Sequence, residues 1–305
     1  MELKWGDNKI TFIVDTIQSI GYESKGGSIV GHKLAYELAC LGHFVYIHNP
    51  PLYPHKNIGV IKTEKFEIDG GWRYSFQTEH FRFKQNHTVS IYSQITGGNP
   101  FNTDNVTRWI LHDYEEGKWE TFKENDYICN YGVFKVPKGT EQSPLTTLDY
   151  KFDKLINYNN PNRGGFAHLF HKNTPKWGYD FLKNIGSTLI PTYNGTKDLD
   201  YLTEEFNKYE YLLTFDDKSY YTSMAGLCGT KSIILNPNPK LTPLEYRKQN
   251  PIQMCGVAYG INDIDWANKT IGLVRDNLLQ IEKQDKLTIS NFANYWENKL
   301  NKIKK

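Results

Sequence analysis

The chain has 305 residues, a formal net charge of +2 and a hydrophobic content of 39%. This composition is typical of a globular chain of two domains and argues against a disordered protein. The small net charge argues against a protein that binds nucleic acid or an acidic membrane through its total charge. The amino terminus lacks an apolar signal segment, and no run approaches the roughly 18 apolar residues of a membrane span, so we expect neither secretion nor membrane insertion.

The first half of the chain begins with an alternation of strand and helix. Lys9–Asp15 is a nearly continuous apolar run that predicts a buried strand, Ser28–Leu41 repeats its apolar residues at helical spacing, and Phe44–His48 predicts the next strand. A glycine pair, Gly26 and Gly27, comes just before the helix. Such glycines let a phosphate or sugar approach the backbone, although an ordinary tight turn explains them equally well.

The rest of the first half predicts a sheet that ends in a linker. Short β-like runs are expected at 58–95, which includes Trp72–Phe76 and Val89–Ser93, and then at Val106–His112 and Asp126–Val133. A tight turn over Gly97–Phe101 separates two of these runs. Lys135–Pro144 is rich in Pro, Gly, Thr and Ser, so we expect an α/β domain at 1–140.

The second half repeats the alternation. Strands are predicted at Lys154–Tyr158, Phe166–Phe170, Ser187–Pro191, Tyr211–Phe215 and Ser232–Leu235. Helices are predicted at Thr174–Ile185, Leu199–Tyr209, Ser223–Cys228, Thr242–Gln249, Asp265–Lys283 and Thr288–Lys302. This order predicts a second parallel-sheet domain at 150–285 and a terminal helix at 286–305 that folds back across the first domain. The predicted fold class is therefore α/β, with two facing Rossmann-like domains.

A polar cluster interrupts the apolar stretch between residues 211 and 237. Asp216, Ser219, Thr222 and Ser223 fall at the carboxyl end of one predicted strand and at the start of the next helix. Ligands of open α/β sheets bind at this edge, and a helix amino terminus favours a phosphate. The alternative is an ordinary β-α-β unit in which an Asp or Ser caps the helix.

Three further side chains are candidates for catalysis. Arg163 and Lys172 flank one predicted strand, and both can neutralise the charge that builds on a diphosphate leaving group. Solvated surface cations are the alternative for this pair. His112 ends a strand of the first domain and is expected to line a cleft, unless it is a half-buried structural histidine.

Metal-binding motifs are weak in this sequence. Asp198-Leu-Asp200 and Asp263-Ile-Asp265 match a D-x-D pattern, but each precedes a predicted helix, where aspartates are favoured in any case. No HExxH, Cys/His set or Walker A sequence occurs. We therefore expect no metal and no cofactor. Four cysteines without a Cys-x-x-Cys pair are typical of small core residues in a reducing compartment: Cys40, Cys129, Cys228 and Cys255.

These segments together resemble the GT-B glycosyltransferases, and within them the retaining family-4-like group. TSMAGLCGTKSIILNP is similar to the E-A-x-A-x-G-x-P-V-I segment that grips the donor nucleotide, and ELACLGHFVYI is similar to L-x-x-x-G-H-x-V of the first domain. ITGGNPFNTDNVTRWIL, RGGFAHLFHK and FDDKSYYTSMAGLCG also resemble sequences of that group. The resembling segments come from both halves of the chain.

The resemblance implies roles for the candidate residues. Gly26 and Gly27 would approach the donor phosphate, and Arg163 with Lys172 would neutralise the diphosphate. Asn99, in the resembling GGNPF segment, and His112 would serve the first-domain side of the cleft. The family's two donor-side glutamates would fall at Asp216 and Met224, so the first is conservatively replaced and the second is missing. Ser219, Thr222 or Ser223 would then substitute for it.

The resemblance also implies the reaction. A sugar would pass with retention, and without a metal, from a nucleoside-diphosphate sugar to a hydroxyl of a glycan, a lipid-linked molecule or another acceptor, in glycan or polysaccharide synthesis. The protein would be cytoplasmic, or peripheral to a membrane through its acceptor. Two alternatives stay open: a non-catalytic nucleotide- or sugar-binding member, suggested by the missing acid, and a nucleotide-sugar epimerase with His112 or Glu79 as its base. The net charge argues against a nucleic-acid acceptor.

Overall fold

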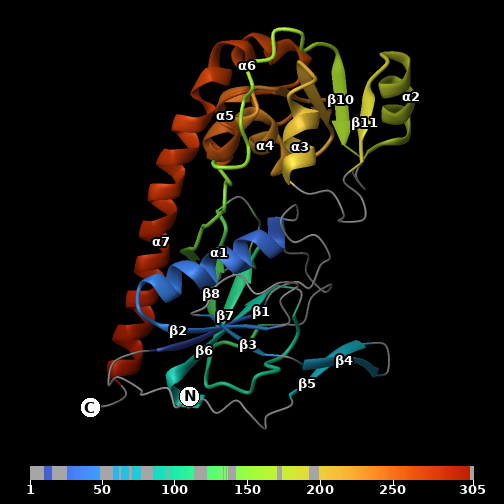
Figure 1. Ribbon diagram of the computed structural model, residues 1–305. Coiled ribbons are helices and arrows are strands. Elements are labelled where there is room, and N and C mark those ends of the chain that lie inside the picture. The colour runs from blue at the N-terminus through green and yellow to red at the C-terminus, as the bar shows by residue number, and fades with distance from the viewer. Residues whose placement is uncertain are drawn as a thin grey trace. The chain divides into compact units, whose positions relative to one another are not determined.

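The computed structural model describes residues 10–15, 26–48, 58–61, 63–68, 71–76, 85–94, 96–112, 122–132, 134, 136, 142–169, 174–191 and 199–302. The chain divides into two compact units (Figure 1). The first contains Met1–Ser19, Gly27–Leu148 and Gln284–Lys305, and Asp149–Lys283 belongs to the second. Each unit is built around one parallel sheet of its own.

The first unit holds a seven-stranded sheet of order β3-β2-β1-β6-β7-β8-β9. Its strands are β1 (Thr11–Asp15), β2 (Phe44–His48), β3 (Ile58–Ile61), β6 (Thr88–Ser93), β7 (Asn105–Ile110), β8 (Tyr127–Asn130) and β9 (Ser143–Pro144). All of their pairings are parallel. The order reverses at β1, because β2 and β3 lie on one side of it and the later strands on the other. This reversal is the topological switch point of a Rossmann-like sheet.

Helix α1 (Gly26–Cys40) connects β1 to β2, and a separate antiparallel hairpin pairs β4 (Thr63–Ile68) with β5 (Gly71–Phe76). The predicted glycine pair therefore opens the helix itself. The loop before it, residues 16–25, lies outside the described residues. All five residues of β1 are buried, as expected of a parallel strand covered on both faces.

The second unit holds a five-stranded sheet of order β11-β10-β12-β13-β14, again entirely parallel. Its strands are β10 (Phe166–Leu169), β11 (Thr188–Ile190), β12 (Tyr211–Thr214), β13 (Lys231–Ile234) and β14 (Val257–Tyr259). The helices are α2 (Lys176–Asn184), α3 (Leu199–Phe206), α4 (Tyr221–Leu227), α5 (Pro243–Gln249), α6 (Ile264–Thr270) and the start of α7 (Val274–Lys302). Here the switch point falls between β10 and β12.

The predicted fold class is confirmed, since two parallel sheets alternate with helices in an α/β architecture. Apolar runs made the strands predictable because their side chains fill the cores. In the second unit Leu213, Ile233 and Ala258 come from three neighbouring strands and pack together with Leu182 of α2. The predicted start of the helix at Thr242 is also confirmed, because Thr242 and Glu245 form a capping box at the start of α5, with Pro243 in the first turn.

Two predicted elements differ from the structure. Lys154–Tyr158 is not a strand, because the amides of Lys154 and Leu155 both bond to the carbonyl of Lys151 and close a turn. The amide of Tyr158 bonds instead to the side chain of Asn207. In the predicted linker, the last two residues form β9 beside β8, so this end of the segment belongs to the first sheet.

The two terminal helices predicted from the sequence are also wrong in their boundaries. The break falls earlier, at the 3-10 turn Ile271–Leu273, and α7 then runs unbroken for 29 residues. Residues 284–287 contain no Gly or Pro to interrupt it. The hydroxyl of Thr288 bonds to the carbonyl of Asp285 within the helix and to the carbonyl of Thr146.

The carboxyl-terminal part of α7 completes the core of the first unit. Trp296 is fully buried, and its indole N–H donates to Thr107 Oγ1 at 3.2 Å. The ring of Phe292 lies 5.7 Å from that of Phe12 in β1. The first unit is therefore built from both ends of the chain.

None of the helices that the structure describes is long and apolar enough to cross a membrane. The four cysteines are free. Cys129 and Cys228 are buried, as expected of core residues, whereas Cys40 is exposed and Cys255 is half-buried. The expectation of four core thiols is therefore wrong for these last two.

Candidate functional site

The polar cluster of the second unit lies at the carboxyl edge of its sheet, beside the switch point. Asp216 follows the end of β12, and its carboxylate Oδ1 accepts the amide of Lys218 at 3.0 Å. The amide of Asp216 in turn donates to Thr214 Oγ1 at 3.0 Å. These bonds fix the turn after β12 and leave the Asp216 side chain half-exposed at the edge where ligands of α/β sheets bind.

Thr222 has a structural role in this loop. Its hydroxyl donates to the carbonyl of Ser219 at 2.7 Å and accepts the side-chain amide of Gln253 at 2.9 Å. Gln253 also accepts the hydroxyl of Tyr246, whose ring stacks on Tyr259. Burial raises the pKa of Tyr246 well above its usual range. Thr222 thus ties α4 to a buried polar network, and its hydroxyl is already occupied.

The hydroxyls of Ser219 and Ser223 differ from that of Thr222. Within the part of the chain that the structure describes, neither makes a hydrogen bond, and Ser223 Oγ is fully buried. The amino-terminal cap of α4 is Tyr220, with no side-chain cap bond. The alternative in which an Asp or Ser caps this helix is therefore wrong, and the buried Ser223 hydroxyl has no exposed surface through which it could contact a ligand.

Arg163 lies at the opposite, amino edge of the same sheet. Its guanidinium donates to four groups that precede strands or follow helices at that edge: Thr230 Oγ1 (3.1 Å), Asn157 Oδ1 (3.0 Å), Asn207 Oδ1 (3.2 Å) and the carbonyl of Cys228 (2.9 Å). Burial lowers the pKa of this guanidinium, against the opposing effect of Cys228 and Glu210. The structure does not bring Arg163 together with Asp216.

Lys176 is a cation that the structure describes at the carboxyl edge, and Lys218, in the turn after β12, is another. Lys172 lies outside the described residues, which resume at Thr174 after β10. Lys176 is the first residue of α2, is exposed, and follows Pro175 at the amino-terminal cap. The signal for it was in the sequence, because a lysine that starts the helix after a parallel strand must lie at the ligand-binding edge.

A close approach fixes α2 against this edge. Gly178 is buried in α2, and a Cβ at this position would lie 2.6 Å from the ring of Phe215, the residue after β12. We therefore expect Gly178→Ala to destabilise the second unit by about 1–3 kcal/mol, because the aromatic ring has to move. A urea titration measures the loss in free energy of unfolding. Hydrogen exchange of peptides from β10 and β12 then shows where the second unit is destabilised. Exchange equal to wild type would show that Phe215 shifts at no cost.

The switch point of the first unit holds a polar pair that the sequence reading missed. Asp15 and His48 end the neighbouring strands β1 and β2 in register, and His48 Nδ1 lies 2.6 Å from Asp15 Oδ1. The second oxygen of Asp15 accepts the hydroxyl of Thr96, which follows β6, at 2.7 Å. Both members of the pair are buried. The signal was a charged or titratable residue closing each of two apolar runs.

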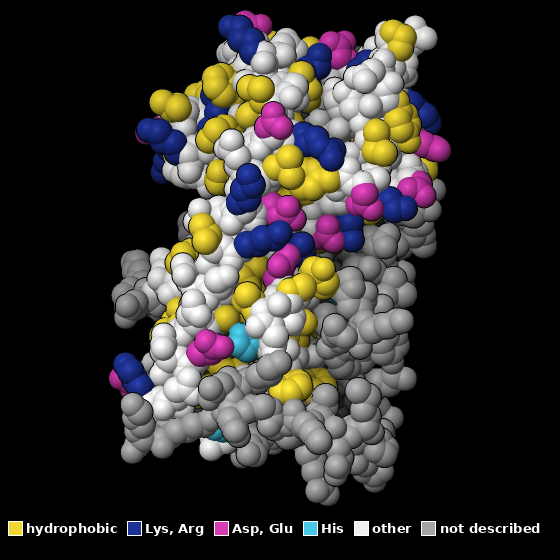
Figure 2. All heavy atoms as spheres, turned by 60° about the vertical axis from the view of Figure 1, so that its left-hand side comes forward, with side chains coloured by type: hydrophobic (Ala, Val, Ile, Leu, Met, Phe, Trp, Pro, Cys, Tyr) yellow, Lys and Arg dark blue, Asp and Glu magenta, His cyan; other side chains and the backbone are white. Residues whose placement is uncertain are grey.

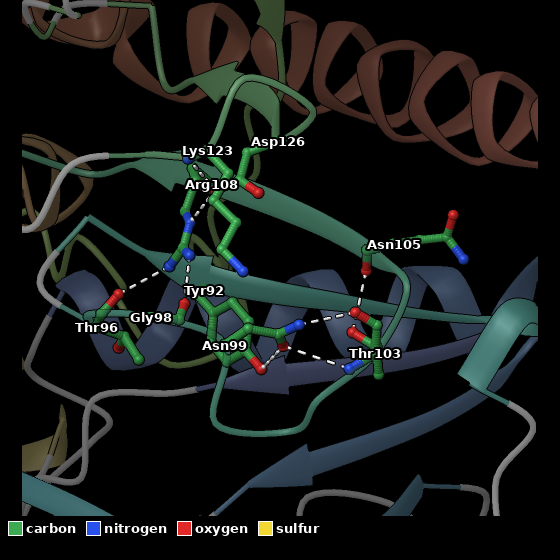
Figure 3. A network of polar contacts seen from close by, with 9 residues as sticks. All are labelled: Tyr92, Thr96, Gly98, Asn99, Thr103, Asn105, Arg108, Lys123 and Asp126. Carbon is green, nitrogen blue, oxygen red and sulfur yellow. Dashed lines mark hydrogen bonds and ion pairs between the residues drawn. The ribbon is translucent and has the colours of Figure 1, made fainter.

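The loop after β6 is held by hydrogen bonds from Arg108 (Figure 3). This side chain is 2% exposed; it pairs with Asp126 at 2.8 Å and donates to the carbonyls of Thr96 and Gly98. Asn99 is also engaged, since its side chain accepts the hydroxyl of Tyr92 at 2.9 Å and donates to the carbonyl of Thr103 at 2.7 Å. These two hydrogen bonds of the Asn99 side chain stabilise the segment between β6 and β7.

His112 follows the carboxyl end of β7 and is exposed, with its ring stacked on Phe134 at 6.1 Å. Glu79, the other candidate base, lies outside the described residues. The structure therefore brings Asp216, Ser219, Thr222 and Ser223 together at one edge, and places Asn99 and His112 on the carboxyl side of the first sheet.

In the described residues, the aspartates of the two D-x-D motifs are not grouped with other side chains that could hold a metal ion. Asp263 is the amino-terminal cap residue of α6, and its carboxylate pairs with Arg247 and accepts the amide of Tyr259. Asp200 lies in the first turn of α3, and Asp198 is outside the described residues. Among the residues that are described, no three His, Cys, Asp or Glu side chains gather so that they could hold a metal ion.

Charges of both signs are interspersed on the face shown in Figure 2. The coloured Lys, Arg, Asp and Glu side chains alternate there with apolar ones. This mixture agrees with the small net charge of the chain.

No family model matches this sequence, and no curated protein matches it. Among solved structures, the chain is similar to the calicheamicin glycosyltransferase CalG4, with a TM-score of 0.42 at 7% identity over 97% of this chain and 99% of that one. It is similar to a glycosyltransferase from Rickettsia africae at 0.43 and 10%, over 97% and 98%. A sucrose-phosphate synthase from Thermosynechococcus elongatus gives 0.43 and 9%, over 97% and 98%.

Proposed function

We propose that this protein is a glycosyltransferase that moves a sugar from a nucleoside-diphosphate sugar to an acceptor hydroxyl. The motifs of both halves that resemble GT-B enzymes support this proposal, as do the two Rossmann-like sheets. The observation that carries it is the carboxyl edge of the second sheet. There the half-exposed carboxylate of Asp216 and the exposed side chain of Lys176 follow the two strands of a switch point.

Each residue has a chemical role in the proposal. Asp216 accepts hydroxyls of the ribose. Lys176, with Lys172, neutralises the diphosphate as the bond from the sugar carbon to the phosphate oxygen breaks. The acceptor oxygen forms the new bond to that carbon, and its proton passes to the departing phosphate. Gly26 and Gly27, at the start of α1, approach the donor phosphate.

We further propose that the sugar is transferred with retention of configuration and without a metal ion. The reaction would belong to glycan or polysaccharide synthesis. In it His112 serves the acceptor side, and the protein works in the cytoplasm or against a membrane that carries its acceptor. A non-catalytic binding protein is the second candidate, because Met224 stands where the second acid is expected and is fully buried. Turnover of any donor, including slow hydrolysis, would exclude that candidate.

The test is donor turnover by wild type and Asp216→Asn with a panel of nucleoside-diphosphate sugars, followed by NMR of the product anomer. We expect Asp216→Asn to lower kcat/KM roughly ten- to hundredfold, since a hydrogen bond to a charged group is lost. Asp200→Asn is the matched control, because that carboxylate is 75% exposed on α3. No turnover and no binding of any donor by wild type would refute the proposal, and equal rates for both variants would remove Asp216 from the site.

A further inference from the structure

An exposed indole lies at the switch point of the second sheet. Trp177 is the second residue of α2 and remains 52% exposed, whereas Trp109 and Trp296 of the first unit are buried. A large apolar ring left in water forgoes the stabilisation that burial would give it. Trp266 of the same unit is also exposed, at 38%, so the surroundings of Trp177 decide what this ring can do.

Two aromatic neighbours fix the position of this ring. Phe215, which follows β12, lies 5.3 Å from Trp177 at an interplanar angle of 78°, and Phe181 lies 6.4 Å away at 70°. The close approach at Gly178 presses α2 onto Phe215 and so orients the indole. Among the described residues no aromatic ring stacks parallel to Trp177. The indole is thus held in place without a stacked partner.

The residues next in sequence to Trp177 and to its neighbour Phe215 carry opposite charges. Lys176 precedes Trp177 on α2, and Asp216 follows Phe215 after β12. A flat ring that follows a cation in the helix and contacts the residue before a carboxylate matches the three parts of a nucleotide, which are a planar base, an anionic phosphate and a ribose with hydroxyls. Stacking on an aromatic side chain suits any base, because every base has a π-face.

We propose that Trp177 stacks on the nucleobase of the donor and supplies much of its affinity. This inference rests on the proposed function and adds to it a residue of the base-binding site. Phe181 and Phe215 act as positioning residues, since they hold the indole and do not contact the base.

The experiment is calorimetric titration of nucleoside diphosphates and of inorganic pyrophosphate into wild type, Trp177→Ala, Trp177→Phe and Tyr179→Ala. We expect Trp177→Ala to weaken nucleotide binding roughly 5- to 150-fold, the range found for base stacking, and to leave pyrophosphate binding unchanged. Trp177→Phe should keep most of the affinity. Tyr179→Ala is the matched control, because Tyr179 is an exposed ring on the same helix, 44% exposed.

A second readout is independent of the size of the affinity change. Nucleotide should quench the tryptophan fluorescence of wild type, and this quenching should be lost in Trp177→Phe. Nucleotide binding that is equal in all four proteins would overturn the stacking role and leave the glycosyltransferase proposal intact. Absence of nucleotide binding by wild type would overturn both. Equal weakening of pyrophosphate and nucleotide by Trp177→Ala would overturn base stacking, because the defect would then lie in the phosphate site.

Discussion

Replacing Arg108 with Met is expected to destabilise the first unit by about 3–5 kcal/mol, because it leaves a buried carboxylate without its partner. Arg108 is 2% exposed and Asp126 has 4% of its side chain exposed, and their atoms lie 2.8 Å apart. The substitution also removes the donors to the carbonyls of Thr96 and Gly98, which hold the loop after β6. Hydrogen exchange of peptides from β6 and β7 under native conditions measures the loss.

The control is the double variant Arg108→Met with Asp126→Leu. Removing both charges should recover most of the stability, since an apolar pair of similar volume commonly replaces a buried ion pair at little cost. The loop carbonyls of Thr96 and Gly98 would still lack donors, so the recovery should be incomplete. If Arg108→Met alone lowers the free energy of unfolding by less than about 1 kcal/mol, the pair of Arg108 and Asp126 is screened by solvent and contributes little.

Arg163→Ala is expected to cost about 2–3 kcal/mol in the second unit. The reason is that one charged side chain satisfies Asn157, Asn207, Thr230 and the carbonyl of Cys228 at the amino edge of the sheet. Asn207 and Thr230 are buried, so water replaces the lost bonds poorly. Hydrogen exchange of peptides that begin β12 and β13 reports the change.

This variant separates two roles of the residue. A structural role predicts lower stability with nucleotide affinity preserved in the folded fraction, whereas a role at the diphosphate predicts a binding loss with stability preserved. Lys208→Ala is the matched control, because Lys208 pairs with Glu205 at an exposed site and should contribute less than about 1 kcal/mol. A binding loss in Arg163→Ala without destabilisation would restore the residue to the phosphate site.

The sequence predicted most of the fold because burial on both faces leaves a continuous apolar run in each parallel strand. The runs at β1, β2, β10, β12 and β13 were read in this way. The predicted strand at Lys154–Tyr158 is wrong because a backbone amide there bonds to a side chain and not to a neighbouring strand. Tyr158 looked like the end of a strand, but its amide bonds to Asn207, which is 49 residues away. Such long-range bonds have no local signal.

The candidate site was predicted in part, for an equally physical reason. Asp216 and its neighbours follow a strand directly, so the sequence alone placed them at the ligand-binding edge. Arg163 precedes its strand, and that order already puts it at the other edge. The pair of Asp15 and His48 could not be found from spacing, because 33 residues separate them and only the parallel register of β1 and β2 brings them together.

The composition of the first unit has a consequence for synthesis on the ribosome. Trp296 and Phe292, which complete its core against Thr107 and Phe12, follow the second unit in the chain. The second unit, Asp149–Lys283, emerges whole before them. Domains usually fold in the order of their synthesis. Here the first unit cannot complete its core until residues that follow the second unit are made, so a product stalled or truncated before them would carry an unfinished apolar surface that invites chaperones and aggregation.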